Sequence, residues 1–274
     1  MLIKIENRTL LRVSGSDAES FLQAQLSNDI TLINNSVQLS CFCQHQGKII
    51  ALFWVLRFGE DFLLSFPEDL SEKVISRLQM FILMSDVQIE DISHSFSQIG
   101  LINEKIQDAY LFNENLSLLI ETNSEINQKS TSLQLNWIKA CIDYQIPEVF
   151  LNSSEKLVPQ MLNLDINQIG VNFSKGCYPG QEVVARLHYL GEAKRRLFTF
   201  KSDSEIQIGD SLYCASSKSA KVRGDRYKGS GIVINSLKYN TIFYCLATLD
   251  VDLLDNKITL NNEHGPILKI IKNE

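Results

Sequence analysis

The sequence predicts an α+β protein that ends in a small antiparallel β-barrel or sandwich. In residues 1–130, segments follow one another as strand, helix, hairpin and helix, which is not the regular strand–helix alternation of a parallel sheet. Beyond Arg196, short apolar runs are separated by Gly, Asn, Asp and Ser, a pattern typical of short antiparallel strands. Neither a GxGxxG loop nor a Walker motif occurs in the chain, so a nucleotide-binding α/β fold is not indicated.

The N-terminal elements follow from side-chain periodicity. Residues 3–6 and 9–13 alternate polar and apolar side chains, and we expect them to pair as a hairpin. A helix is predicted to begin at Ser16, because Ser16 and Glu19 have the S-x-x-E spacing of a capping box.

The next elements form a second hairpin and a second helix. Residues 48–58 and 62–66 are predicted strands around a Gly-Glu-Asp turn, and Pro67 is placed to open a helix. The polar, Asn- and Ser-rich residues 113–132 indicate a connection or a weakly ordered hairpin.

Composition and charge limit the possible functions. The 274 residues are 45% hydrophobic and 21% charged, as in an ordinary globular protein. The formal net charge of −6 argues against a protein that coats nucleic acids. No apolar run approaches the ~20 residues of a membrane helix, and the first residues lack a signal core. We therefore expect a cytoplasmic protein that acts on neither membranes nor nucleic acid directly.

A basic segment precedes the last strands. We interpret it as a solvated barrel loop, with a contact to nucleic acid or a protein partner as the alternative. Its cations are Lys218, Lys221, Arg223, Arg226 and Lys228.

The six cysteines are too sparse for a disulfide scaffold, and none has zinc-site spacing with another cysteine or a histidine. Cys41 and Cys43 lie two residues apart in a strand-like segment, which places both side chains on one face. Reduced cysteine packs as a small hydrophobic residue, so we interpret this pair as core packing.

The stretch Lys175–Glu182, KGCYPGQE, carries the strongest chemical signal. Two glycines bracket its cysteine, which indicates a tight turn with unusual backbone angles, and a helix is predicted to begin near Gln181. The thiol of Cys177 would lie near that helix N-terminus and beside Lys175, which favours the reactive thiolate. The alternative is that Cys177 is only a small residue in a packed turn.

This octapeptide resembles the K-G-C-Y-x-G-Q-E signature of the YgfZ family. The family consists of folate-binding relatives of the glycine-cleavage T-protein that support iron–sulfur proteins and, through one of them, tRNA modification. The resemblance runs from about residue 8 to residue 196. Its other matching segments are Phe21–Asp29, Gly47-Lys48, Ile146-Pro147, Pro159–Leu164, Val183–Arg186 and Gly191–Arg196.

The resemblance implies a fold, a ligand and partners. The family fold is a T-protein-like ring of two ferredoxin-like α+β domains plus a C-terminal β-barrel, around a central cavity. Here residues 1–194 would form the folate-binding region, as two interleaved subdomains, and residues 195–274 the barrel. The implied cofactor is tetrahydrofolate or a related reduced folate. The implied partners are this folate and iron–sulfur proteins or their assembly factors.

The resemblance also proposes site residues. Trp137 stands where the family has a folate-contacting tryptophan, whereas Arg8 replaces a second aromatic residue; a guanidinium can also stack on a π-face. Lys175 and Arg186 are candidate cations for the folate tail, with structural ion pairs as the alternative. We expect one cavity lined by Trp137 and the Lys175–Glu182 loop. The loop adds Tyr178, Gln181 and Glu182 to the candidates, and Cys177 is the expected functional thiol.

The T-protein transfers a one-carbon unit with an aspartate in a G-G-x-x-D-D stretch. In the matching stretch Gly47–Leu52, Ala51 and Leu52 replace the two acidic residues. An apolar side chain cannot exchange a proton, so aminomethyltransferase activity is not expected. The sequence leaves three functions open: a folate-dependent accessory protein for iron–sulfur proteins, an enzyme that uses folate or the thiol, and an interaction module with a vestigial cavity.

Overall fold

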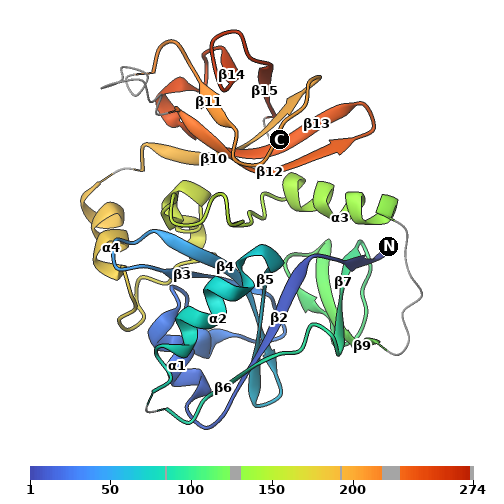
Figure 1. The fold of residues 1–274 in the computed structure, drawn as a ribbon, viewed down its shortest axis with the longest axis vertical. Helices are drawn as coiled ribbons and strands as arrows, with labels where there is room; N and C mark the ends of the chain where they lie inside the picture. Colours follow the sequence, from blue (N-terminus) through green and yellow to red (C-terminus); the bar gives the residue numbers. More distant parts are fainter. Residues whose placement is uncertain (84, 124–130, 192, 218–228, 272–274) are drawn as a thin grey trace.

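The protein consists of two antiparallel sheets with their helices and a closed β-barrel (Figure 1). The computed structural model describes residues 1–83, 85–123, 131–191, 193–217 and 229–271. One hydrophobic core runs through both sheets and the helices that pack on them, and a second core fills the barrel. The predicted α+β class with a C-terminal barrel is confirmed.

The larger sheet has five antiparallel strands in the order β3-β4-β5-β2-β6. These strands are β2 (Arg8–Ser14), β3 (Gln38–Cys43), β4 (Ile49–Phe58), β5 (Asp61–Pro67) and β6 (Gln88–Asp91). Helices α1 (Ala18–Gln25) and α2 (Ser71–Gln79) pack against this sheet (Figure 1). The predicted hairpin of residues 48–58 and 62–66 is confirmed as β4 and β5.

The second sheet has four antiparallel strands in the order β1-β7-β9-β8. They are β1 (Leu2–Ile5), β7 (Phe96–Ile102), β8 (Tyr110–Leu111) and β9 (Leu116–Thr122). The predicted hairpin between residues 3–6 and 9–13 is wrong, because β1 pairs with β7 and β2 pairs with β5 and β6. Asn7, with a φ of 59°, turns the chain from one sheet into the other.

Two further N-terminal expectations are corrected. Helix α1 begins at Ala18, and no side chain caps it, because the hydroxyl of Ser16 instead donates to Asp86 at 2.9 Å. The stretch predicted as a connection or a weakly ordered hairpin contains β9, which forms a hairpin with β8 and also pairs along its full length with β7. Asn and Ser content marked this segment as polar, but its residues 116–119 are buried as part of the second sheet.

The barrel closes in the strand order β10-β13-β12-β11-β14-β15. Its strands are β10 (Arg195–Ser202), β11 (Ser211–Tyr213), β12 (Gly231–Tyr239), β13 (Ile242–Asp250), β14 (Ile258–Leu260) and β15 (Ile267–Ile271). The basic segment singled out in the sequence, residues 218–228, lies outside the described residues.

Two helices connect the sheets to the barrel. Helix α3 (Thr131–Asp143) contacts β1 and β7 on one side and β12 and β13 on the other, so it lies between the second sheet and the barrel (Figure 1). Helix α4 (Gln181–Leu190) ends just before the barrel begins. Across the described ranges, no helix is long and apolar enough to cross a bilayer.

Candidate functional site

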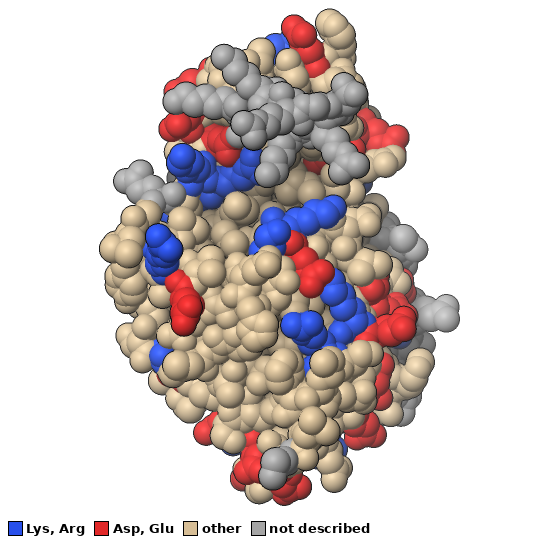
Figure 2. Space-filling model, turned by 60° about the vertical axis from the view of Figure 1, so that its left-hand side comes forward, with Lys and Arg blue, Asp and Glu red and all other residues tan. Residues whose placement is uncertain are grey.

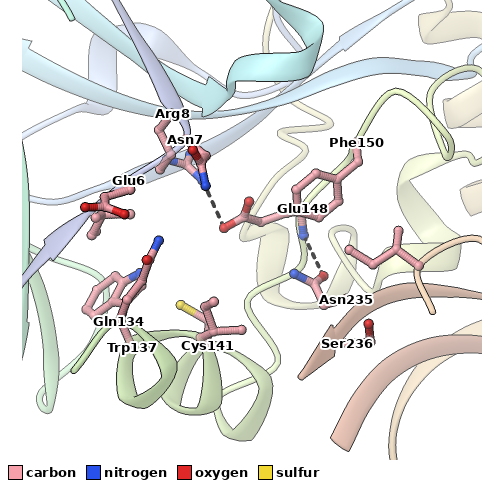
Figure 3. Close-up of a pocket in the computed structure, with 13 residues that line it drawn as sticks. Glu6, Asn7, Arg8, Gln134, Trp137, Cys141, Glu148, Phe150, Asn235 and Ser236 are labelled. Atoms are coloured by element: carbon pink, nitrogen blue, oxygen red, sulfur yellow. Dashed lines mark hydrogen bonds and ion pairs between the residues drawn. The ribbon is translucent and has the colours of Figure 1, made fainter. Parts of the chain in front are cut away.

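A cavity lies where the two sheets, α3 and the barrel meet. Its volume is about 160 Å³. Figure 3 shows Arg8 above the cavity, Trp137 and Cys141 below it on α3, and Glu148 beside it. Its lining comes from five parts of the chain: Ile5, Glu6, Asn7 and Arg8; Gln134, Trp137, Ile138 and Cys141; Glu148 and Phe150; Ile208; Asn235 and Ser236.

Arg8, the first residue of β2, is held on three sides. Its guanidinium carbon lies 3.4 Å from the centroid of the Trp54 ring, and its Nε donates to the Ser65 hydroxyl at 2.8 Å. The Ser65 hydroxyl in turn donates to Gln98. On the third side Nη1 forms an ion pair with Glu148 Oε1 at 2.9 Å. Burial lowers the pKa of Arg8, and the Glu148 carboxylate acts in the opposite direction.

Trp137 belongs to a cluster of three aromatic residues. Its ring centroid lies 6.3 Å from that of Trp54 and 5.9 Å from that of Phe112, and Trp54 and Phe112 meet edge to face at 4.8 Å. A Cβ at Gly100 would lie 2.3 Å from Trp137 Cε3, so glycine in β7 lets the indole pack against the strand. Trp137 therefore gives the cavity an aromatic wall, and Trp54 and Phe112 pack behind it.

Two donor nitrogens at this cavity have no hydrogen-bond acceptor among the described residues. They are Nη2 of Arg8 and Nε1 of Trp137, on residues only 9% and 2% exposed. Leaving a buried donor unpaired costs on the order of 1–3 kcal/mol, so such groups cluster where a ligand or water completes them. The cavity thus presents donors to a molecule that brings acceptors.

Glu148 and Cys141 complete the polar part of the lining. The backbone N–H of Glu148 donates to Asn235 Oδ1 at 3.1 Å, which ties this segment to barrel strand β12. Burial raises the pKa of the Cys141 thiol, and the nearby Glu148 carboxylate raises it further. Cys141 is therefore a neutral, apolar part of the wall.

The expectation that the Lys175–Glu182 loop lines the same cavity as Trp137 is wrong. None of the loop residues is part of the lining, because the loop docks on the turn between β3 and β4. Gly180 has a φ of +83°, and a Cβ there would lie 2.4 Å from the carbonyl oxygen of Gln44. Gly176, in contrast, has nothing within 4 Å of an added Cβ, so only Gly180 shows the unusual backbone angle expected of both.

The Lys175 ammonium is directed into the protein. It donates to the carbonyl oxygens of Gln23 at 2.6 Å and Asn28 at 3.1 Å, and also to that of Leu26. Burial lowers the pKa of Lys175 to about 8, and Asp29 acts in the opposite direction. The ammonium satisfies carbonyls at the end of α1, so it is engaged there rather than turned toward Cys177 or the cavity.

Tyr178 anchors the loop from the other side. It is only 7% exposed, and its ring centroid lies 5.3 Å from the Lys175 ammonium. Burial, with Cys43 and Cys41 nearby, raises the pKa of the Tyr178 hydroxyl, which stays protonated. Helix α4 then begins at Gln181, as predicted.

Cys177 is exposed, whereas the other five cysteines are buried. Glu182 and Arg186 also lie on the exposed part of α4, next to apolar side chains such as Tyr189, which is 66% exposed. Figure 2 shows this side of the molecule, where uncharged residues separate scattered basic and acidic groups. No cluster of three or more potential metal ligands occurs within the described part of the chain.

Sequence reasoning missed Trp54 and Glu148. Trp54 lies in the apolar run of β4 and is 1% exposed, so nothing in the pattern separates it from core residues. Glu148 directly follows Ile146-Pro147, and an acidic residue beside a matched segment was a usable signal. Ala51 and Leu52 are buried in β4 as ordinary core residues.

The architecture is that of a T-protein. A solved glycine cleavage system aminomethyltransferase T from Bartonella henselae superposes with a TM-score of 0.66, over 99% of this chain and 84% of that one, at 13% identity. The family model for the GCVT N-terminal domain matches residues 2–103.

Sequence relatives give the narrower family. A Colwellia psychrerythraea protein described as "tRNA-modifying protein YgfZ" is 30% identical over 237 residues, 74% of this chain and 72% of that protein. Its counterpart in Photorhabdus laumondii is 26% identical over 273 residues, 87% and 80% of the two chains. An uncharacterized protein of Haemophilus influenzae is 31% identical over 77% of each chain. The chain belongs to the YgfZ family.

Proposed function

We propose that this chain is a cytoplasmic folate-binding accessory protein that supports the assembly or repair of iron–sulfur cluster proteins. The observation that carries the folate part is the set of unpaired donors, from Arg8 and Trp137, in a cavity with an aromatic wall. The iron–sulfur part, with its indirect effect on tRNA modification, rests on membership of the YgfZ family.

The donor set fits the chemistry of a folate head group. A pterin is a flat aromatic ring with hydrogen-bonding atoms along one edge. It needs a stacking surface, donors for its acceptors and an acceptor for its N–H groups. Trp137 supplies a ring and a donor, Arg8 supplies donors, and Glu148 supplies a carboxylate that is 15% exposed in the cavity lining.

The size of the cavity limits which part of a folate it holds. Pockets that enclose a whole drug-sized ligand measure roughly 300–1,000 Å³. The cavity here measures about 160 Å³, so the head group is the part that we assign to it. The benzoyl-glutamate tail would then extend toward solvent, where neither Lys175 nor Arg186 is required to meet it.

A bound reduced folate supplies ring nitrogens that accept or carry a one-carbon unit. This chain's own residues bind and orient the head group, but the positions of the T-protein's acidic pair are Ala51 and Leu52, both buried. We therefore propose binding without aminomethyl transfer. The exposed thiol of Cys177 is the group that we assign to work with client proteins.

The test is calorimetric titration of tetrahydrofolate into the purified full chain. The proposal expects saturable binding with one site per chain. Absence of a binding isotherm at millimolar ligand would overturn the folate part. Iron–sulfur enzyme activities in a strain that lacks the gene, restored by the wild-type chain but not by Cys177→Ala, test the accessory role separately.

A further inference from the structure

The Arg8–Glu148 pair places a hydrogen-bond donor directly beside an acceptor at the cavity. Nη1 and Oε1 lie 2.9 Å apart, and Nη2 of the same guanidinium is buried without an acceptor among the described residues. Figure 3 shows the two side chains meeting in the lining, Arg8 from β2 and Glu148 from the irregular segment before Phe150.

Both members of the pair are fixed in place. The guanidinium cannot turn, because Trp54 covers one face at 3.4 Å and Ser65 accepts from Nε. The Glu148 backbone is held by Asn235 at 3.1 Å. A preorganised donor–acceptor pair discriminates between ligands because a mismatched partner leaves buried polar groups unpaired.

The pair also restricts the charge of the ligand. A purely anionic ligand, such as a phosphate, would gain from Arg8 but would be repelled by the Glu148 carboxylate, which lies 2.9 Å from Arg8 Nη1. The arrangement instead suits a neutral edge that carries an acceptor next to a donor.

We propose that Arg8 and Glu148 together recognise the 4-oxo edge of the pterin and so select 4-oxo over 4-amino pteridines. In a 4-oxopteridine the C4 carbonyl accepts while the adjacent N3–H and the 2-amino group donate, which matches Arg8 and Glu148 respectively. In a 4-aminopteridine both positions are reversed, so the amino group meets the guanidinium and N3 meets the carboxylate. The proposal rests on the proposed folate function and names the chemistry of that same site.

The test compares tetrahydrofolate with tetrahydroaminopterin, which differ only at C4. Binding to the full chain is followed by calorimetry. We expect tetrahydrofolate to bind at least about tenfold more tightly, since the mismatch leaves buried groups unpaired. Equal affinities would overturn the 4-oxo selection and leave the folate function intact, whereas binding of neither compound would overturn both.

Arg8→Met assigns the selection to this residue. The variant should bind tetrahydrofolate at least about tenfold more weakly and lose the preference between the two compounds. Arg12→Met is the matched control, because Arg12 lies on the same strand, pairs with Asp61 at 2.5 Å and does not line the cavity. If Arg8→Met does not fold, as judged by its circular dichroism, Glu148→Gln is used instead. This variant should reduce the ratio between the affinities for tetrahydrofolate and tetrahydroaminopterin. A preference that survives unchanged in the folded variant would overturn the proposal.

Discussion

The cavity beneath Arg8 and the loop around Cys177 are built in opposite ways. At the cavity, buried side chains from two sheets, a helix and the barrel surround a small space, and polar atoms there lack partners. In the loop, the Lys175 ammonium donates to three backbone carbonyls and Tyr178 is buried, whereas the thiol of Cys177 is exposed. The first region is prepared for a small molecule, and the second presents a single reactive group at the surface.

This difference indicates two separate roles, ligand binding at the cavity and thiol chemistry at the loop. The family motif alone does not distinguish them. The octapeptide marks the loop, and most of its residues serve to build and dock that loop. The residues that face the cavity, such as Arg8, Trp137 and Glu148, lie outside the octapeptide. If the account is right, damage to the loop lowers stability or thiol function, whereas damage to the cavity lowers ligand affinity.

The largest expected effect is on stability, from Gly180→Ala. Its φ of +83° is unfavourable for alanine, and the new Cβ would lie 2.4 Å from the Gln44 carbonyl oxygen and 2.7 Å from Gly47 Cα. We expect a loss of about 3 kcal/mol in the free energy of unfolding, measured by urea denaturation. Gly176→Ala in the same motif is the control and should change it by less than about 0.5 kcal/mol. If Gly180→Ala and Gly176→Ala lowered the free energy of unfolding equally, the close approach at Gly180 would not explain why this position is a glycine.

Lys175→Met should cost about 2 kcal/mol, because carbonyls of Gln23, Leu26 and Asn28 lose a charged donor. Ligand affinity should be unchanged in the folded variant, since Lys175 does not line the cavity. Urea denaturation and calorimetry measure the two quantities. If the Lys175→Met variant had normal stability but bound folate poorly, Lys175 would belong to the ligand site.

The same residue predicts a pH dependence. The folded-state pKa of Lys175 is lowered to about 8 from an ordinary value of 10.5, so between these values the unfolded chain binds more protons than the folded one. Stability should therefore rise with pH across this window relative to Lys175→Met, in which this contribution is absent. Urea denaturation of the wild type and of Lys175→Met at several pH values in the window measures this dependence. If the free energy of unfolding changed with pH in the same way in both chains, the lowered pKa would be contradicted.

Cys177 should react first with iodoacetamide under native conditions, as located by mass spectrometry, because the other five cysteines are buried. Cys177→Ala should leave stability nearly unchanged, whereas Cys41→Ala should cost about 1 kcal/mol through lost packing. Because Cys177 is not part of the cavity lining, bound tetrahydrofolate should leave its alkylation rate unchanged. If folate protected Cys177 from alkylation, the cavity and the loop would form one site.

The smallest effect is expected at Trp137. Trp137→Phe keeps an aromatic ring and removes the unpaired Nε1 donor, so tetrahydrofolate affinity should fall by a few-fold. Calorimetry measures the change, and Phe112→Leu, which alters the same aromatic cluster outside the cavity lining, is the control. If Trp137→Phe left the tetrahydrofolate affinity unchanged, the indole would contribute only packing.

The sequence predicted the parts of the fold that depend on local pattern. Two apolar runs around a Gly-Glu-Asp turn identified the β4–β5 hairpin, and the short C-terminal strands indicated the barrel. Local pattern could not reveal that β1 leaves β2 for the second sheet, because strand partners are chosen by tertiary contacts.

The candidate site was predicted in part, for the same reason. Trp137 and Arg8 were named from the resemblance, and both line the cavity. Lys175 was named as a cation available to a ligand, but no one-dimensional pattern shows that its ammonium caps the end of α1, far away in the sequence. Trp54 was hidden because a tryptophan under a guanidinium has the same sequence context as one in a core.

Intrinsic fluorescence during a tetrahydrofolate titration tests the central claim most directly. The chain has two tryptophans: Trp137 lines the cavity, and Trp54 packs against Trp137 and under the Arg8 guanidinium. The account predicts a saturable change in their emission, with a midpoint that matches the calorimetric affinity and that shifts to higher ligand concentration in Arg8→Met. Calorimetric binding without any change in tryptophan emission would place the folate site elsewhere and contradict the account.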